Sequence, residues 1–326
     1  MKVFLTGAAG FIGSHTAERL VAAGHEVVGF DSFDDYLYPS GVKRTTAATL
    51  LASLPSARFR LVEGDIADET AVATVFSSHR PDVICHLAAL AGVRPSLAEP
   101  LRYTRTNVHG TTVILEACRR HGIDRVVFAS SSSVYGVRDP VHVVAFREED
   151  PCLHPASPYA ATKRAGELMC STYRDLFGIG ISSLRFFTVF GPRQRPDMAI
   201  HKFVAAISSG RPIHVFGDGT SRRDYTYIDD IVSGVVAACL RVEPGAYNIY
   251  NLGGTVTTSL AELVSMIEVV VGRAAIIDRQ PVQPGDVPIT FADVNNAARD
   301  LDYSPSTPVR LGLERFWEWY RTRQTA

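Results

Sequence analysis

Cysteine is scarce in this sequence and is not arranged in pairs. The 326 residues include five cysteines, an odd number, and no two of them form a Cys-x-x-Cys pair. Disulfide-rich secreted domains and structural zinc sites both depend on closely spaced cysteines, so the sequence excludes these two classes. We therefore expect a cytoplasmic protein without a metal site, whose thiols are reduced and mostly buried. These are Cys85, Cys118, Cys152, Cys170 and Cys239.

Long apolar runs and an excess of one charge are also missing. No segment reaches the roughly 20 apolar residues that a membrane helix needs, and no long apolar run precedes Gly7. Thirty-three lysine and arginine residues against 34 aspartate and glutamate residues give a formal net charge of −1. We expect no export signal, no membrane anchor and no nucleic-acid partner, so any recognition of phosphate must be local.

What the sequence does contain is a glycine turn between a strand pattern and a helix pattern. A β-rich run over residues 2–6 stops at Gly7, and Gly10 and Gly13 follow. Glycines let the backbone turn close to a pyrophosphate, whose charge lies at the positive end of the next helix. A second strand pattern ends at Asp31, where an acid can hold an adenosine ribose diol and disfavour a 2′-phosphate. The motif favours NAD over NADP, and the alternative for Asp31 is a turn or cap residue.

Strand and helix patterns go on alternating through the first half. The strand-like runs cover residues 58–63, 82–86 and 125–129, and the helical stretches between them cover 69–78 and 101–121. Repeated βαβ units predict a Rossmann-type, doubly wound parallel sheet that binds ligands at the carboxyl ends of its strands. Asp65 and Ile66 are placed to frame an adenine, and Ala88 and Ala89 to let the cofactor backbone pass. A helix-capping role is nearly as well supported for Asp65.

Tyr159 and Lys163 form the candidate catalytic pair. They lie four residues apart in a helix pattern over residues 158–177, so the phenol and the ammonium share one face. A run of four serines, Ser130 to Ser133, precedes them. A free phenol has a pKa of about 10, and a nearby ammonium is expected to lower that pKa toward neutral pH. The spacing alone occurs by chance, and the nucleotide motifs upstream give it meaning.

In this order, the motifs resemble those of extended short-chain dehydrogenases/reductases of the NAD-dependent nucleotide-sugar epimerase type. The resemblance covers nearly the whole chain. It implies that Tyr159 is the base, that Lys163 binds the nicotinamide ribose and lowers the pKa of the tyrosine, and that Ser131 bonds the sugar hydroxyl that is oxidised. The residues that it implies at the cofactor are Gly7, Gly10, Phe11, Ile12, Gly13, Asp31, Ser32, Asp65, Ile66, Leu87, Ala88, Ala89, Asn107, Ser130, Tyr159 and Lys163.

The residues beside Ser131 distinguish members of this family by the fate of the ketone. Related 4,6-dehydratases carry an Asp-Glu pair before the Val-Tyr-Gly sequence, and related UDP-glucuronate decarboxylases carry a Glu just before that valine. This chain has Ser132 and Ser133 there. Elimination and decarboxylation are therefore disfavoured, and return of the hydride to the opposite face remains, which is an epimerisation.

The second half most resembles the UDP-glucuronate 4-epimerases, through RFFTVFGP at 185–192, RPDMA at 195–199, AGVR at 91–94 and QPGD at 283–286. UDP-galactose 4-epimerases usually have Asn where Thr188 stands. The resemblance implies that Thr188 and the serines bond the carboxylate at carbon 6, with Arg195 as a nearby cation. For Arg195, a surface or pyrophosphate-side position is weighed equally.

The same resemblance places Phe216 beside the uracil, Arg223 at the pyrophosphate and Asp286 at the uridine ribose. Two adjacent arginines are often simply solvated, which is the alternative for Arg223. The residues implied at the substrate are Arg94, Ser131, Ser132, Tyr159, Thr188, Arg195, Ala199, Phe216, Arg223 and Asp286.

We therefore expect a UDP-glucuronate 4-epimerase that retains NAD. The alternatives are a UDP-galactose or UDP-N-acetylhexosamine 4-epimerase and a non-catalytic NAD-binding sensor. The expected α/β chain has an NAD-binding domain over 1–190, re-entered at about 225–255, and a smaller mixed α/β UDP-sugar-binding domain over 191–224 and 256–326. Helices 101–121 and 158–177 pair into a dimer interface in this family, so a homodimer is expected.

Overall fold

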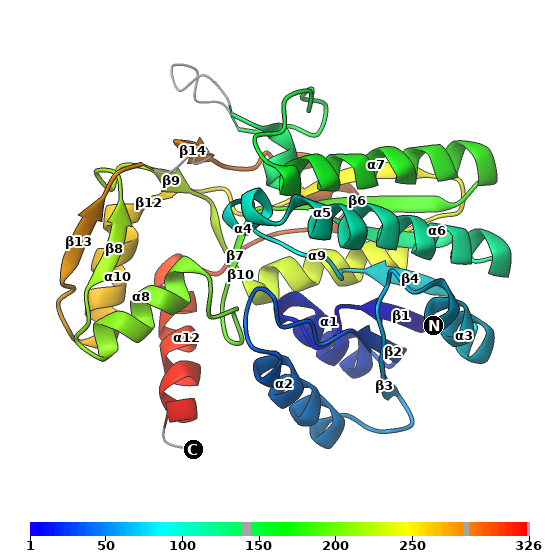
Figure 1. Ribbon diagram of the computed structural model, residues 1–326, viewed down its shortest axis with the longest axis horizontal. Coiled ribbons are helices and arrows are strands. Elements are labelled where there is room, and N and C mark those ends of the chain that lie inside the picture. The colour runs from blue at the N-terminus through cyan, green and yellow to red at the C-terminus, as the bar shows by residue number, and fades with distance from the viewer. Residues whose placement is uncertain (138–144, 283–286, 325–326) are drawn as a thin grey trace.

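A seven-stranded parallel sheet forms the larger part of the molecule in the computed structural model, which describes residues 1–137, 145–282 and 287–324 (Figure 1). Its strand order is β3-β2-β1-β4-β5-β6-β11. The strands are β1 (Lys2–Thr6), β2 (Glu26–Asp31), β3 (Phe59–Glu63), β4 (Val83–His86), β5 (Arg125–Ser131), β6 (Gly180–Phe186) and β11 (Tyr247–Leu252). The order reverses between β1 and β4, which opens a crevice at the carboxyl ends of the strands. The predicted doubly wound sheet is confirmed.

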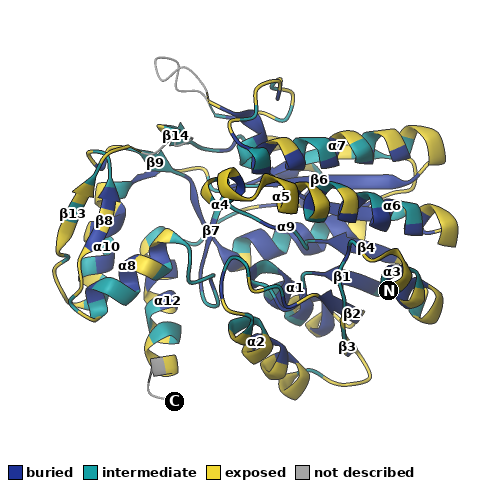
Figure 2. Ribbon diagram, viewed as in Figure 1, coloured by how far each residue is buried: buried dark blue, intermediate teal, exposed yellow. Residues whose placement is uncertain are grey.

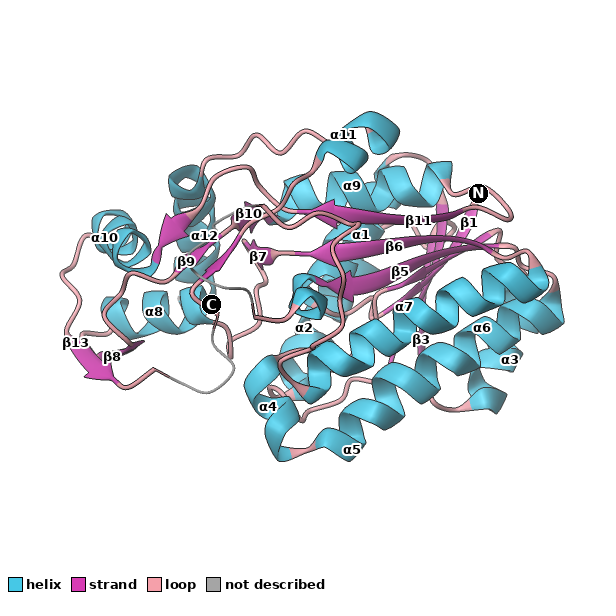
Figure 3. Cartoon of the chain, turned by 90° about the horizontal axis from the view of Figure 1, so that it is seen from above, coloured by secondary structure: helices cyan, strands magenta, loops and turns pink. Residues whose placement is uncertain are grey.

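Helices cover both faces of this sheet (Figure 3). On one face lie α1 (Phe11–Ala22) and α9 (Ile228–Arg241), with α2 (Ser40–Ser53) beside α1. On the other lie α3 (Glu69–His79), α6 (Gly110–His121) and α7 (Pro158–Phe177). Because both faces are covered, the central strands are mostly buried, and Val3, Phe4 and Leu5 of β1 are fully buried. Figure 2 shows exposed residues mainly along the outer sides of the helices.

Among the described residues, the smaller part of the molecule contains short strands and four helices. The strands pair as β7 (Thr188–Phe190) with β10 (Tyr225–Tyr227), β8 (Ile213–Phe216) with β13 (Ile277–Gln280), and β9 (Arg222–Arg223) with both β12 (Thr258–Ser259) and β14 (Ile289–Thr290). The helices are α8 (Ala199–Ser208), α10 (Leu260–Val271), α11 (Asn295–Leu301) and α12 (Val309–Gln324). Helices α8 and α12 pack on α10, whereas α11 packs on α9 and β11 of the larger part.

The predicted helical stretch over residues 101–121 is helical throughout, but it is not a single α-helix. The structure has α5 (Pro100–Tyr103), a π-helical turn (Thr104–His109) and then α6. The π turn directs the Asn107 side chain inward, where its amide bonds both the nitrogen and the oxygen of Leu90 at 2.8 and 2.9 Å. These two buried hydrogen bonds stabilise the wider turn. π turns are rare and cluster near functional sites.

Helix α7 matches its predicted bounds because both of its ends carry strong local signals. The Ser157 hydroxyl accepts a hydrogen bond from the Ala160 nitrogen at 3.2 Å, and Pro158 occupies the first turn. Gly178 ends the helix with φ 70°. The helix brings Tyr159 and Lys163 to the carboxyl ends of β5 and β6.

Candidate active site

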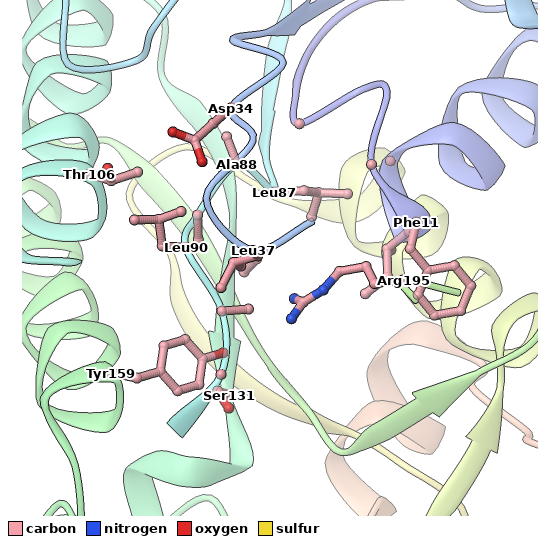
Figure 4. Close-up of a pocket in the computed structure, with 18 of the residues that line it drawn as sticks. Phe11, Asp34, Leu37, Leu87, Ala88, Leu90, Thr106, Ser131, Tyr159 and Arg195 are labelled. Carbon is pink, nitrogen blue, oxygen red and sulfur yellow. The ribbon is translucent and has the colours of Figure 1, made fainter. Parts of the chain in front are cut away.

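A cavity of about 1100 Å³ opens at the carboxyl ends of the parallel strands and extends to the start of α8. Figure 4 shows Tyr159 and Ser131 on one side of it and Arg195 reaching in from the other. Most of the predicted site residues line this cavity. They are Gly7, Gly10, Phe11, Ile12, Gly13, Asp31, Ser32, Asp65, Ile66, Leu87, Ala88, Ala89, Arg94, Ser130, Ser131, Ser132, Tyr159, Lys163, Thr188, Arg195 and Ala199.

Three predicted site residues are not part of the lining. Asn107 is buried behind the wall, where it bonds the Leu90 backbone and the Thr162 hydroxyl. Phe216 stacks under the Arg94 guanidinium, 4.4 Å from ring centre to carbon, and so reaches the cavity only through Arg94. Arg223 donates to the carbonyl oxygens of Arg222 and Pro288. Asp286 lies outside the described residues.

The glycine turn joins β1 to the start of α1. Gly7 has a φ of 71°, a conformation that side-chain-bearing residues rarely adopt. A Cβ at Gly13 would lie 2.0 Å from the Gly7 carbonyl oxygen, so the turn can form only with glycine there. The first residues of α1 line the cavity, and the positive end of the helix therefore faces it.

Asp31 combines the two roles that the sequence left open. Its carboxylate accepts hydrogen bonds from the backbone nitrogens of Ala9 and Phe33 at 3.0 and 2.9 Å, which fixes the turn, and the residue also lines the cavity. Burial raises the pKa of Asp31, and the nearby Lys43 ammonium opposes this effect. Asp65 likewise combines both roles: its carboxylate accepts from the Ala67 nitrogen at 2.9 Å in the turn before α3, and the residue lines the cavity. The N-cap of α3 itself is Asp68, and Asp65 also pairs with Arg105.

The catalytic candidates converge at the end of β5. The Ser131 hydroxyl lies beside the Tyr159 phenol (Figure 4) and donates to the Ser133 hydroxyl at 3.1 Å. Lys163 donates to the Ala129 carbonyl at 2.7 Å. The neighbouring residue Ser130 also lines the cavity. Its hydroxyl, however, donates to Glu167 at 2.6 Å and so points away from the cavity. Consecutive residues of one strand thus hold the lysine and the tyrosine of α7.

The structure does not show the expected lowering of the Tyr159 pKa by Lys163. Burial raises the pKa of Tyr159, and the opposing influences are the hydrogen bond from Ser131 and the charge of Arg195. Burial also lowers the pKa of Lys163, to about 7. A lysine near its titration point carries only part of its charge, so it cannot stabilise a phenolate as fully as an exposed ammonium would.

Arg195 is not a surface arginine. Its side chain is only 17% exposed, and its guanidinium forms a forked ion pair with Asp197, with nitrogen to oxygen distances of 3.0 and 2.6 Å. Burial raises the pKa values of Tyr38 and Tyr159, and the charge of Arg195 partly opposes this rise. Arg195 therefore provides a cation at the same end of the cavity as the catalytic candidates. Two nitrogens of the Arg195 guanidinium are already bonded to the Asp197 carboxylate.

A loop that the sequence interpretation did not use also lines the cavity. The loop after β2 contributes Leu37 and Tyr38, and the following helix α2 contributes Lys43. The Tyr36 hydroxyl donates to the Pro95 carbonyl at 3.0 Å and so ties this loop to another segment. Lys43 donates to the Asp34 carbonyl at 2.7 Å. The available signal was position, because residues that follow an acid at the end of β2 lie at the ribose end of such a crevice. Asp34, Arg102, Arg105, Asp197 and Lys202 were likewise missed in the lining.

In the described part of the chain, no group of three or more His, Cys, Asp or Glu side chains is arranged to hold a metal ion. Within the same residues, no helix is both long and apolar enough to cross a bilayer. The five cysteines are buried and form no disulfide with one another.

Comparisons with known proteins agree with this geometry. A model of the NAD dependent epimerase/dehydratase family matches residues 3–253. A probable UDP-glucuronate 4-epimerase of Rhizobium meliloti (strain 1021) is 40% identical, over 98% of this chain and 97% of the relative. The crystal structure of the UDP-glucuronic acid 4-epimerase of Bacillus cereus, in complex with UDP-glucuronic acid and NAD, is 37% identical. It covers 99% of this chain and 100% of its own, with a TM-score of 0.91.

Fold similarity extends equally to a relative with different chemistry. A dTDP-glucose 4,6-dehydratase of Streptomyces venezuelae, a double mutant with NAD bound, is 31% identical and has a TM-score of 0.90. It covers 98% of its own chain and 100% of this one. The fold alone therefore does not decide the reaction, and the side chains in the cavity must. On the family match and the full-length relatives, this chain belongs to the NAD dependent epimerase/dehydratase family.

Proposed function

We propose that this protein is a UDP-glucuronate 4-epimerase, which interconverts UDP-glucuronate and UDP-galacturonate through a 4-keto intermediate and retains NAD. The observation that carries the proposal is the serine run in the cavity. Ser131 lines the same cavity as Tyr159, and Ser132 and Ser133 stand where an acid for elimination would have to stand. The full-length likeness to relatives with this activity supports the same conclusion.

The residues at the nucleotide end fit NAD. The glycine turn places the start of α1 at the cavity. This turn requires glycine at position 13, because a Cβ there would collide with the Gly7 carbonyl. A buried acid, Asp31, lies beside it and suits two ribose hydroxyls. When bound, NAD supplies the acceptor for the hydride of carbon 4 and afterwards its donor.

Tyr159 is the proposed base and acid for the hydroxyl at carbon 4. It takes the proton as the ketone forms and returns it as the alcohol forms again, on the other face. Ser131, which lies beside the phenol, is proposed to guide the sugar hydroxyl to it. Lys163 is anchored by the Ala129 carbonyl and is proposed to bind the nicotinamide ribose.

The sugar carboxylate is proposed to lie between Thr188, Ser132 and Arg195. All three line the same cavity. Hydroxyl groups can hold a carboxylate with neutral hydrogen bonds, and a close cation strengthens that hold. A 4-keto uronate is a β-keto acid that loses carbon dioxide when the bond to its carboxylate stands perpendicular to the ketone plane. Fixing the carboxylate away from that geometry would protect the intermediate.

We propose that the chain forms two domains. The NAD-binding domain comprises residues 1–190 and is re-entered at about 225–255, and the UDP-sugar-binding domain comprises residues 191–224 and 256–326. The pairing of β11 with β6 supports this return. Arg94, Ala199, Phe216, Arg223 and Asp286 are proposed to hold UDP. The Arg94 and Phe216 contact supports a joint role for these two residues at the mouth of the cavity.

A homodimer through α6 and α7 is part of the proposal, as is a cytoplasmic location. Leu168 and Leu176 on α7 are 53% and 67% exposed, and Leu101 on α5, which continues into α6 through the π turn, is 84% exposed. Exposed leucines on neighbouring helices are expected where a second copy covers them. Light scattering of the purified protein should give the mass of two chains, and Leu168→Glu should give one.

The activity is tested by incubating the purified protein with UDP-glucuronate and no added nicotinamide nucleotide. Formation of UDP-galacturonate is expected. Turnover of UDP-galactose or UDP-N-acetylgalactosamine in preference to UDP-glucuronate would favour the neutral-sugar alternative. No conversion of any UDP-sugar, with NAD bound, would favour the sensor.

A further inference from the structure

The segment that carries Arg195 is tied to the cofactor-binding helix by a cluster that the mechanism above does not use. Arg193 forms a forked ion pair with Glu18 of α1, with its NH1 nitrogen 2.9 Å from the carboxylate. It also donates to Nδ1 of His15 at 2.9 Å, and the opposite ring nitrogen of His15 donates to the Pro192 carbonyl at 2.9 Å. Two side chains of one helix therefore hold two consecutive residues of the segment.

The backbone of Arg193 is held in an unfavourable conformation. Its φ is 65°, in the left-handed region, where a residue with a side chain is disfavoured by about 1 kcal/mol or more. Such a conformation persists only where the surroundings determine it, and it often marks a functional constraint. The Arg193 side chain is 12% exposed, so its pairing with Glu18 is also shielded from water.

The contacts of Arg193 with Glu18 and His15 are here called the clamp. Only Gln194 separates the clamp from Arg195, and Gln194 is held firmly enough to pass a displacement of Arg193 on to Arg195. Its side chain is buried and its amide donates to the Val189 carbonyl at 3.1 Å. Its backbone nitrogen bonds the Gly191 carbonyl, and its own carbonyl accepts from His201 at 2.8 Å. A shift of Arg193 would therefore be passed on to the neighbouring guanidinium in the cavity.

We propose that Arg193 is a positioning residue, and that its clamp to Glu18 and His15 aims Arg195 at the sugar carboxylate and so sets the preference for acidic over neutral UDP-sugars. This inference rests on the role proposed above for Arg195. It adds the origin of that role in α1, the helix whose first residues line the cofactor end of the cavity. Burial and the charge of Arg193 lower the pKa of His15 to about 4, which keeps the ring neutral and its Nδ1 able to accept.

The test compares two constants on the holoenzyme: the KM for UDP-glucuronate and the inhibition constant of UDP-glucose, which differs from the substrate at carbon 6. For Glu18→Gln and for Arg193→Gly, we expect the KM to rise about tenfold, because a charge-assisted contact is lost. The inhibition constant of UDP-glucose should stay within about twofold, since it has no carboxylate to misplace. Glycine at 193 also removes the backbone strain, so a smaller effect than that of Arg193→Ala is expected.

A matched control is Glu314→Gln, which removes the same charge from an exposed ion pair with Arg310. It should change neither constant. If the KM and the inhibition constant rise together in the clamp variants, or if neither moves, the inference is overturned. Because Glu18 is itself 37% exposed, its replacement by the isosteric Gln should leave folding intact, and a melting curve checks this.

An Arg195→Gln variant separates failure of this inference from failure of the proposed function. If Arg195→Gln raises the KM selectively and the clamp variants do not, only the positioning role is wrong. If Arg195→Gln also leaves the ratio of the two constants unchanged, the carboxylate contact fails and the clamp inference fails with it.

Discussion

The two sides of the cavity are built in different ways. On one side, residues 129–131 at the end of β5 and Tyr159 and Lys163 on α7 belong to long, regular elements whose ends are capped. On the other, residues 191–198, here called the crossing segment, have no helix or strand and depend on ion pairs made by Arg193 and Arg195. The first arrangement resembles what any dehydrogenase of this fold requires. The second is where a particular sugar would be selected.

The contrast teaches where substitutions should act. Changes at the sheet side should abolish turnover or cofactor binding, whereas changes at the crossing segment should alter the choice of substrate and leave the chemistry in place. Backbone hydrogen bonds in regular elements fix positions tightly, but loops held by a few side chains can be retuned one residue at a time. The predictions below run from the largest effect on the sheet side to smaller effects nearer the carboxylate.

Replacing Tyr159 by Phe should lower kcat by about a thousandfold or more, because the proton acceptor for the 4-hydroxyl is lost. Binding of the UDP-sugar should survive, as equilibrium binding would show. The control is Tyr103→Phe, which removes a neighbouring buried hydroxyl that bonds the Ala91 carbonyl at 3.0 Å. A fall of less than tenfold for Tyr159→Phe would remove the tyrosine from the role of base.

Gly13→Ala should weaken NAD binding about a hundredfold, equivalent to roughly 3 kcal/mol, because overpacking forces the glycine turn apart. The added Cβ would lie 2.0 Å from the Gly7 carbonyl oxygen. Gly41→Ala is the matched control, since that glycine is also helical but has no atom within 4 Å of the added methyl. The content of bound NAD after purification is the readout, and equal content in both variants would contradict the prediction.

His86 should make the sheet side labile to acid. Its two ring nitrogens bond the hydroxyls of Thr6 and Thr111 at 2.8 and 3.0 Å, and burial lowers its pKa to about 3. The folded pKa lies below the unfolded value, so stability is complete above about pH 6.5 and is lost as the pH falls toward 3. By pH 5 the loss should be about 2 kcal/mol.

Urea denaturation at pH 7 and pH 5 measures this loss. His86→Gln should be less stable at pH 7 but should show a smaller difference between the two pH values. Curves with the same pH dependence for both proteins would mean that His86 does not contribute.

At the carboxylate, Thr188→Ala and Ser132→Ala should each release UDP-pentose a few times faster than the unchanged protein, because a loosened carboxylate reaches the geometry for decarboxylation. Chromatography of the products measures the ratio of pentose to uronate. Ser183→Ala, which alters a buried serine on β6, serves as a control. No rise in either variant would argue against protection of the ketone by these residues.

The sheet side could be predicted well from the sequence because its signals are local. The bounds of β1 and α7 agree to the residue, and the glycine turn, Asp31, Tyr159 and Lys163 all line one cavity. Each of these depends on the spacing of residues within one element or on the turn that follows it.

The remaining features depend on tertiary packing that no short pattern encodes. The π turn that turns Asn107 toward Leu90 is stabilised by partners 17 residues away in the sequence. The raised pKa of Tyr159 follows from burial, which spacing alone does not reveal. The loop with Leu37 and Tyr38 reaches the cavity only because Tyr36 bonds Pro95, on a different segment.

In the proposed epimerisation, hydrogen leaves carbon 4 and returns to the same carbon of the same sugar inside the cavity. The most direct test uses UDP-glucuronate that carries deuterium at carbon 4, in ordinary water and without added nucleotide. The account predicts that the UDP-galacturonate formed keeps the deuterium at carbon 4. Replacement of that deuterium by hydrogen from the solvent would contradict it.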